Sequence, residues 1–176
     1  MRLYYLIDRV PELPYFIFAL IFVLYTPVEV AKQVFAVSCL FMVSGIIVGV
    51  SLKVLLKTKR PCEYHCIPYV KYDVPSLHTL LSIGAIAYIC FINVKYCVFA
   101  IPMGYTYMIS RLRLGLHTKK AVYVGAAVGL LMGSLFGYLL WRIDFHGFEY
   151  PMSVLFFLIP VSATLFRLKY LGHNKI

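Results

Sequence analysis

Long apolar runs separated by short polar segments dominate this chain of 176 residues. Such runs predict helices, and several approach the ~20 residues that a helix needs to cross a bilayer. The connections between them are short, and the chain shows no internal repeat. The pattern therefore predicts an all-α polytopic transmembrane bundle of about six spans, forming one integral-membrane domain over residues 1–176. The runs are Leu13–Tyr25, Val34–Leu56, Thr79–Ile92, Tyr96–Ile109, Ala121–Trp141 and Met152–Leu168.

Composition supports a membrane location. Hydrophobic residues make up 62% of the chain and charged residues 14%, whereas roughly a quarter of the residues of a soluble domain are charged. We therefore expect a multi-pass membrane protein, with the cell membrane as its location. The net charge of +10 is not gathered in one soluble segment, so membrane lipids and phosphate are better partners than nucleic acid.

With six spans, the termini and the second and fourth loops share one side of the membrane. That side carries most of the cations, whereas Lys32, Lys95 and Arg142 fall on the other. The positive-inside rule would make the cation-rich side cytoplasmic. Some of its cations are also candidate phosphate ligands, so the side that bears the site stays open.

Cysteines give no strong signal of a metal site. Cys39, Cys90 and Cys97 lie in apolar runs, where they are expected to be small buried hydrophobic residues. Cys62 and Cys66 share a loop that suits a metal clip or a disulfide, but no second cluster completes a tetrahedral site. An ordinary loop with reduced thiols is favoured.

The first polar motif is Lys53 followed by Arg60-Pro61. If the second helix continues past Lys53, both cations lie on one side of it, about 10 Å apart along its axis. Pro61 would then help to end the helix. Taken alone, the motif is explained as well by a snorkelling lysine and a basic membrane flank.

The second motif, Pro75-Ser76-Leu77-His78, stands where the third span should begin. Ser76 suits the N-cap, and the backbone N–H groups that follow it would form an anion site at the helix start. His78 falls in the first turn. The plainer alternative is a helix cap followed by an interfacial histidine.

The third motif runs from Ser110-Arg111 to His117 and joins the fourth and fifth spans. An arginine leaving one helix, a glycine permitting a turn at Gly115 and a histidine entering the next helix can converge on one anion. A basic membrane loop is the alternative.

Together, the order and internal spacing of these motifs resemble the signatures of the type 2 phosphatidic acid phosphatase superfamily. That superfamily also includes bacterial polyprenyl-diphosphate phosphatases, glucose-6-phosphatase and vanadium haloperoxidases. The resemblance covers residues 53–117 and implies a phosphatase/haloperoxidase-like helical core.

The resemblance also implies roles for individual residues. His117 would attack phosphorus to give a phosphohistidine, and His78 would protonate the leaving group. No metal or cofactor is implied, because fixed cations would supply the charge that magnesium supplies elsewhere. The residues implied to bind phosphate are Lys53, Arg60, Ser76 and Arg111.

Two positions depart from the family pattern. Leu77 replaces a glycine, and Ala121 replaces the aspartate that orients the nucleophilic histidine. Asp73 is the first candidate for a substitute carboxylate, and Glu63 in the same loop is the second. A backbone carbonyl or a water molecule would also serve.

Two classes of function follow from this resemblance. The first is a metal-independent membrane lipid phosphatase, with a polyprenyl diphosphate as the leading substrate and phosphatidic acid or phosphatidylglycerol phosphate as the alternative. The second is a catalytically silent relative that binds or moves phospholipid in the same pocket. The enzyme is favoured because both histidines and all three cations of the motifs are present.

Overall fold

The computed structural model describes residues 24–61 and 71–140, together with a few isolated positions nearer the two ends. These residues form the helices α3 (Val28–Leu56), α4 (Leu77–Ile92), α5 (Cys97–Arg113) and α6 (Lys119–Leu140), with the short 3₁₀ helix η2 (Val94–Tyr96) before α5. Within those two ranges there is no strand, and the one β-bridge is isolated. The described part of the chain is therefore all-helical, as predicted.

The four long helices coincide with four of the predicted apolar runs, although α3 begins at Val28 rather than Val34. By length and composition, α3 and α6 suffice to cross a membrane, and α4 is a shorter apolar helix. The runs at Leu13–Tyr25 and Met152–Leu168 lie almost entirely outside the described residues. The number of about six spans therefore stays a prediction.

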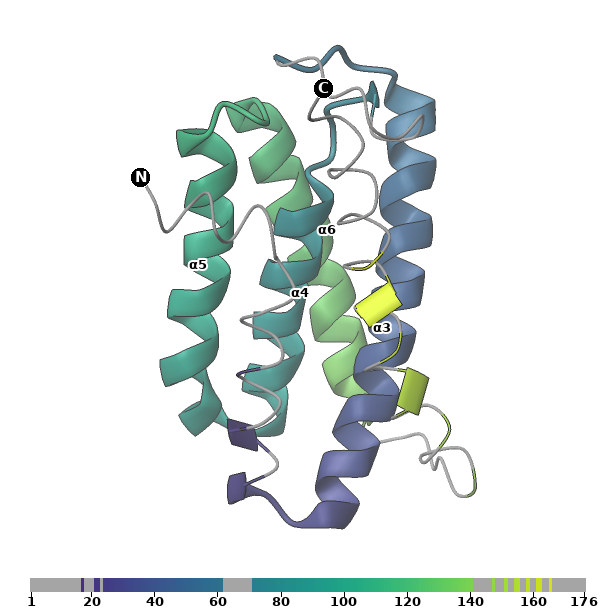
Figure 1. Ribbon diagram of the computed structural model, residues 1–176, viewed down its shortest axis with the longest axis vertical. Coiled ribbons are helices and arrows are strands. Elements are labelled where there is room, and N and C mark those ends of the chain that lie inside the picture. The colour runs from purple at the N-terminus through teal and green to yellow at the C-terminus, as the bar shows by residue number, and fades with distance from the viewer. Residues whose placement is uncertain are drawn as a thin grey trace.

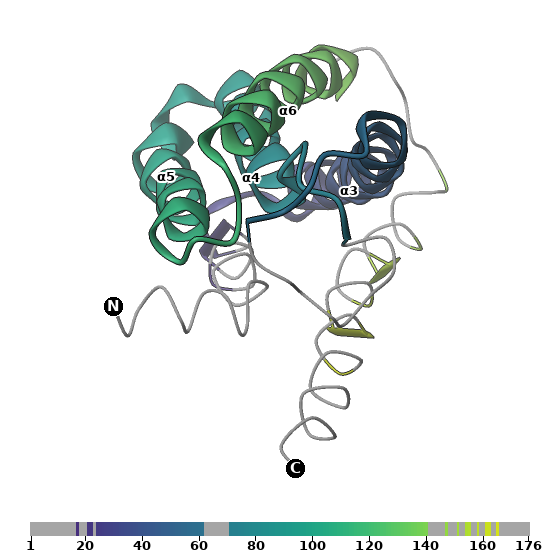
Figure 2. The same cartoon turned by 90° about the horizontal axis from the view of Figure 1, so that it is seen from above.

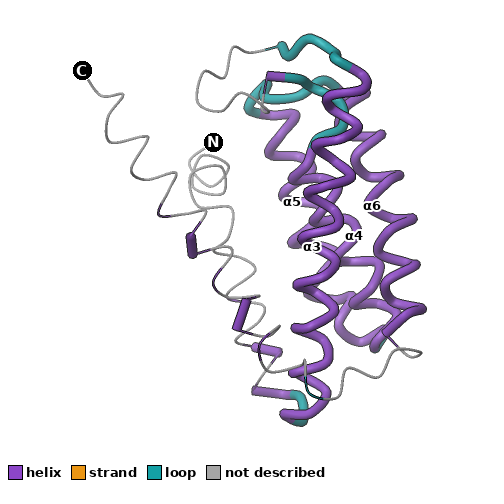
Figure 3. The backbone as a smooth tube through the Cα atoms, turned by 90° about the vertical axis from the view of Figure 1, so that its right-hand side faces the viewer, coloured by secondary structure: helices purple, strands orange, loops and turns teal. Residues whose placement is uncertain are grey.

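Successive helices run in opposite directions, so their connections gather at two ends (Figures 1 and 3). At the upper end in Figure 1 lie the loop from α3 to α4 and the turn from α5 to α6. At the lower end lie the start of α3 and the turn through η2. These two regions are the upper end and the lower end of the bundle. All three sequence motifs fall at the upper end.

Helix α4 occupies the centre of the bundle and contacts α3, α5 and α6, as the view from above shows (Figure 2). In its lower half, Tyr88 of α4 packs against Phe41 of α3, with ring centroids 5.5 Å apart. Phe41 also packs against Phe136 of α6 at 5.6 Å. Buried aromatic residues therefore join three helices there.

The closest helix pair, α4 and α6, depends on glycine. Gly125, Gly129, Gly133 and Gly137 recur every fourth residue and so share one face of α6. A Cβ atom at Gly129 would lie 2.2 Å from the carbonyl oxygen of Leu80 on α4. The two backbones therefore approach too closely for any side chain at this position, as at the small-residue interfaces of membrane helices.

The end of α3 corrects the expected continuation of that helix to Arg60. The helix ends at Leu56, because Lys57 adopts left-handed backbone angles (φ 44°, ψ 33°), and its N–H closes the last turn on the Lys53 carbonyl. Lys59 then forms an antiparallel bridge with Tyr72. Arg60 is therefore placed by this bridged loop and not by the helix, and Pro61 plays no part in ending it.

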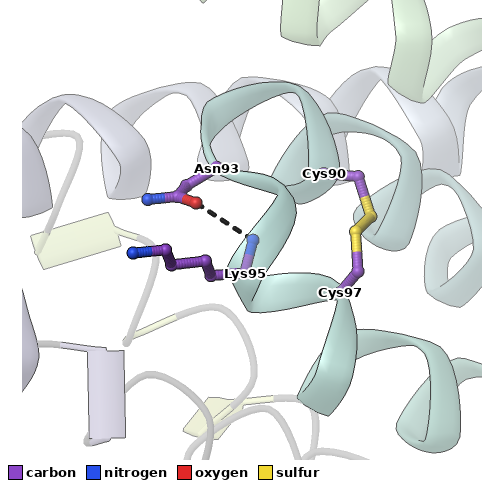
Figure 4. The surroundings of a disulfide bond; sticks show 4 residues. All are labelled: Cys90, Asn93, Lys95 and Cys97. Carbon is purple, nitrogen blue, oxygen red and sulfur yellow. Dashed lines mark hydrogen bonds between the residues drawn. A yellow bond between two sulfur atoms is a disulfide. The ribbon is translucent and has the colours of Figure 1, made fainter.

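The cysteines of the lower end give a second correction. Cys90 and Cys97 form a disulfide across the turn from α4 to α5, with their Cα atoms 5.5 Å apart (Figure 4). The turn is tight because Asn93 ends α4 and its side chain accepts a hydrogen bond from the Lys95 amide (Figure 4). Cys39 is a free buried cysteine, as expected. Cys62 and Cys66 lie outside the described residues.

Candidate functional site

Several polar and charged side chains are buried at the upper end of an otherwise apolar bundle. The exposed fractions are 4% for Lys53, 1% for Asp73, 3% for Arg111 and 5% for His117, and Ser76 has none. Burying a charged group is costly unless specific contacts compensate for the lost hydration. A cluster of this kind therefore indicates a built site.

His117 lies just before α6, at the end of a tight turn. Gly115 has a positive φ of 64°, a conformation that glycine adopts without strain, and the Leu116 amide donates to the Arg111 carbonyl at 3.1 Å. The turn delivers the imidazole between two partners. Its Nδ1 lies 2.7 Å from Oδ1 of Asp73, and its Nε2 lies 2.8 Å from Nη2 of Arg60.

These partners determine the tautomer of His117. A guanidinium group only donates hydrogen bonds, so Nε2 must accept from Arg60. Nδ1 then carries the proton and donates it to the Asp73 carboxylate. The ring is therefore neutral, with the lone pair of Nε2 directed toward a cation.

The electrostatic environment favours the same state. Burial lowers the pKa of His117, and the neighbouring Arg60 guanidinium lowers it further, to about 4. The hydrogen bond to Asp73 acts in the opposite direction and is the weaker influence. The imidazole is accordingly a neutral potential nucleophile at physiological pH.

Asp73 is held from two sides. One carboxylate oxygen, Oδ2, accepts hydrogen bonds from the hydroxyl of Thr118 at 2.5 Å and from the Thr118 amide at 3.3 Å. On the other side, the ammonium group of Lys53 donates to the backbone carbonyls of Tyr72 and Asp73, at 2.8 and 2.9 Å. These contacts leave Oδ1 directed at His117.

Thr58 attaches the same segment to the loop that carries Arg60. Its carbonyl accepts from the Asp73 amide, and its hydroxyl accepts from the Val74 amide, both at 2.9 Å. The backbone around Asp73 is therefore fixed by α3 and by the loop that follows it.

Ser76 occupies the N-cap position of α4 as predicted, but its side chain makes no capping hydrogen bond. Its hydroxyl instead accepts from Thr79 at 3.0 Å, and its amide donates to the carbonyl of Ala121 at 2.9 Å. His78 lies in the first turn of α4 and is half-buried. The second motif is thus joined to the first turn of α6 through backbone atoms.

Arg111 lies in the last turn of α5, at the same end of the bundle. Its Nε donates to the Ser110 hydroxyl at 3.3 Å, and that hydroxyl donates to the Tyr107 carbonyl at 2.7 Å.

Hydrogen bonds link Lys53, Arg60, Asp73 and His117 into one network. Arg111 in the last turn of α5, and Ser76 and His78 at the start of α4, lie at the same end of the bundle.

Sequence reasoning missed Thr118 and Thr58, and it treated Lys53 as a phosphate ligand without foreseeing its contacts with the backbone. Thr118 carried a recognisable signal, because a threonine at the start of an apolar run is a typical N-cap. Its hydroxyl does accept from the Ala121 amide at 3.2 Å. Glu63, the other candidate carboxylate, lies outside the described residues.

Within residues 24–61 and 71–140, no group of three or more histidine, cysteine, aspartate or glutamate side chains is arranged to hold a metal ion. The charge at the upper end comes from lysine and arginine instead. No protein-family model, curated protein or solved structure matches this chain.

Proposed function

We propose that this chain is a metal-independent membrane lipid phosphatase that works through a phosphohistidine at His117. One observation carries the proposal: a buried neutral imidazole has a carboxylate on Nδ1 and a guanidinium beside Nε2. A carboxylate orients an imidazole and stabilises the cation that forms when its other nitrogen attacks. A guanidinium beside the attacking nitrogen is suited to hold the phosphoryl group that is attacked.

The local charge supports an anionic ligand. Lys53, Arg60 and Arg111 bring three positive charges to the upper end, and Asp73 is the acidic residue described there. Lys53 uses two of its three donors on backbone carbonyls, which leaves one for a phosphoryl oxygen. A phosphate dianion would balance this charge.

The reaction proceeds in two steps. In the first, phosphate oxygens replace Nε2 of His117 as acceptors of the hydrogen bonds that Arg60 donates. The lone pair of Nε2 then forms a bond to phosphorus. The bond from phosphorus to the leaving oxygen breaks, and His78 gives that oxygen a proton. In the second step, His78 accepts a proton from water, the resulting hydroxide attacks phosphorus, and the bond from phosphorus to Nε2 breaks. Inorganic phosphate leaves and His117 is restored.

The apolar helices favour a substrate with a lipid tail, since two of them are long and apolar enough to cross a membrane. Within this class a polyprenyl diphosphate is the leading substrate, because residues 24–61 and 71–140 form only helices and short connections, without a soluble domain that would select a larger headgroup. Phosphatidic acid and phosphatidylglycerol phosphate are the alternatives.

A catalytically silent phospholipid binder is the competing proposal, and it rests on alanine at position 121. Asp73 weakens that case, because it supplies a carboxylate 2.7 Å from Nδ1 of His117 without any help from position 121. The enzyme proposal therefore remains the better supported of the two.

The test is phosphate release by the purified full-length protein from polyprenyl diphosphate, phosphatidic acid and phosphatidylglycerol phosphate, with EDTA present. We expect turnover of at least one substrate, loss of turnover in His117→Ala, and an acid-labile phosphoenzyme in the wild type that His117→Ala does not form. Arg60→Ala should lose turnover as well, because Arg60 is proposed to hold the phosphoryl group. Its matched control is Lys57→Ala, which removes an exposed cation of the same loop. Binding of lipid phosphates without turnover would favour the silent relative.

A further inference from the structure

We propose that Thr118 is a positioning residue that locks the Asp73 carboxylate in the orientation that His117 requires. The two carboxylate oxygens have separate partners. Oδ2 accepts from the hydroxyl and the amide of Thr118, and Oδ1 accepts from Nδ1 of His117. A carboxylate group turns about a single bond, so fixing one oxygen also fixes the other.

The direction of the Thr118 hydroxyl is itself determined by α6. Its oxygen accepts from the Ala121 amide, which is one of the N–H groups at the helix start that lack a partner within the helix. The hydroxyl proton is then free to point at Asp73, and a carboxylate has no proton to offer in return. The start of α6 thus orients the Thr118 hydroxyl so that it donates to Asp73.

This arrangement explains how the chain can use a carboxylate that precedes α4 in the sequence. An aspartate at position 121 would lie on the same helix as its histidine, one turn away. Asp73 comes from a separate loop, so a group next to His117 has to fix the position of the Asp73 carboxylate relative to the imidazole. Thr118 is adjacent to His117 in the chain and contacts Asp73 twice.

The test compares Thr118→Val, which removes the hydroxyl at nearly constant volume, with Thr118→Ser, which keeps it. Thr106→Val is the matched control, because the hydroxyl of Thr106 donates to the Pro102 carbonyl on α5, away from Asp73 and His117. All variants are studied as the full-length protein in detergent micelles. The first readout is the exchange rate with water of the Nδ1–H proton of His117, measured by NMR.

We expect Thr118→Val to speed this exchange about 10-fold and to lower kcat about 10- to 100-fold, with KM changed less than about 3-fold. Thr118→Ser and Thr106→Val should resemble the wild type in both readouts. Unchanged exchange and kcat in Thr118→Val would overturn the proposal, as would equal losses in Thr106→Val.

The turnover readout rests on the proposed phosphatase activity, whereas the proton exchange readout does not. If the wild type releases no phosphate, the proposed function fails, and the exchange rate alone decides the role of Thr118. A wild-type Nδ1–H proton that exchanges as fast as that of a solvent-exposed imidazole would contradict the lock itself.

Discussion

His117 and Asp73 stand 44 positions apart in the sequence and meet through a hydrogen bond of 2.7 Å. If this bond orients the nucleophile, Asp73→Asn should lower kcat by about 10²- to 10⁴-fold, because an amide favours the wrong tautomer and cannot stabilise the charged ring. KM should change little, since phosphate binding depends on the cations. Steady-state kinetics on the preferred lipid phosphate provide the measurement.

Glu29→Gln is the matched control for that substitution. Glu29 is an exposed acid in the first turn of α3, at the lower end of the bundle. Its replacement makes the same chemical change and should leave kcat at the wild-type value. Equal effects of the two substitutions would exclude a specific role for Asp73.

An aspartate introduced at position 121 should harm the protein, because Asp73 already contacts His117. Ala121 is fully buried and its carbonyl accepts from the Ser76 amide. Ala121→Asp would place a second carboxylate in a packed site where Asp73 already serves His117, so it should destabilise the protein by several kcal/mol without raising turnover. Thermal unfolding and kcat test this prediction. Ala121→Ser is the control, because it adds a small polar group without a carboxylate. A rise in kcat would show that Asp73 does not fill the role.

The pKa of His117 makes stability depend on pH. The folded state holds this pKa at about 4, against 6.5 for an unperturbed histidine. Between those values the unfolded chain binds more protons than the folded chain, so stability falls as the pH falls. We expect the Tm of the wild type to drop between pH 7 and pH 4.5 by more than that of His117→Asn. Equal drops would mean that His117 titrates normally.

The residue scale also shows where sequence reasoning reached its limit. The three motifs identified the basic residues Lys53, Arg111 and His117 that are buried at the upper end, because such residues are rare in apolar chains. The sequence could not show which groups Lys53 contacts. Its ammonium group donates to the carbonyls of Tyr72 and Asp73, some twenty positions away. Asp73 was one of several candidates until its distance from His117 separated it from the others.

At the scale of elements, the glycine face of α6 sets how closely that helix approaches α4. Gly129→Ala would bring a Cβ atom to 2.2 Å from the Leu80 carbonyl oxygen and to 3.1 Å from the Gly84 amide nitrogen. Backbone atoms cannot move aside as a flexible side chain can, so the helices must separate, at a cost of about 1–3 kcal/mol. Thermal unfolding in detergent should show the loss.

Ala127→Val is the control for this substitution, because it adds bulk to an exposed position of the same helix. It should leave the Tm nearly unchanged. Gly129→Ala should also reduce turnover, because Thr118 caps the start of α6 and the Ala121 carbonyl of α6 accepts a hydrogen bond from Ser76. A Tm equal to that of the wild type would contradict the tight packing of α4 and α6.

Hydrophobic runs were sufficient to predict α3, α4, α5 and α6, because an apolar segment flanked by polar residues has few other stable conformations in a membrane. They were insufficient for the end of α3, where Lys57 turns left-handed and the chain pairs Lys59 with Tyr72. They also missed the disulfide between Cys90 and Cys97, which depends on a turn whose length no periodicity reveals. Local pattern predicts elements, whereas these features arise from contacts between them.

For the whole molecule, two independent features bear on its orientation in the membrane. Most described lysine and arginine residues lie at the upper end, whereas Lys32 and Lys95 lie at the lower end. If α3 to α6 cross a membrane, the positive-inside rule predicts that the upper end, with the candidate site, faces the cytoplasm. The disulfide between Cys90 and Cys97 spans the turn through η2 at the lower end, and disulfides persist mainly in oxidising compartments. Both features point the same way.

We therefore expect cysteines introduced at Lys57 and Lys119 to react with a membrane-impermeant thiol reagent only after the cells are made permeable. A cysteine introduced at Lys95 should react in intact cells. All three positions are exposed, and the experiment uses a background in which Cys39, Cys62 and Cys66 are replaced by serine. Labelling of Lys57 and Lys119 alone in intact cells would reverse the orientation and place the site outside. Identical labelling at the two ends would show that the helices between them do not cross the membrane, and a lipid phosphate could then reach the site only from the surface on which the protein lies.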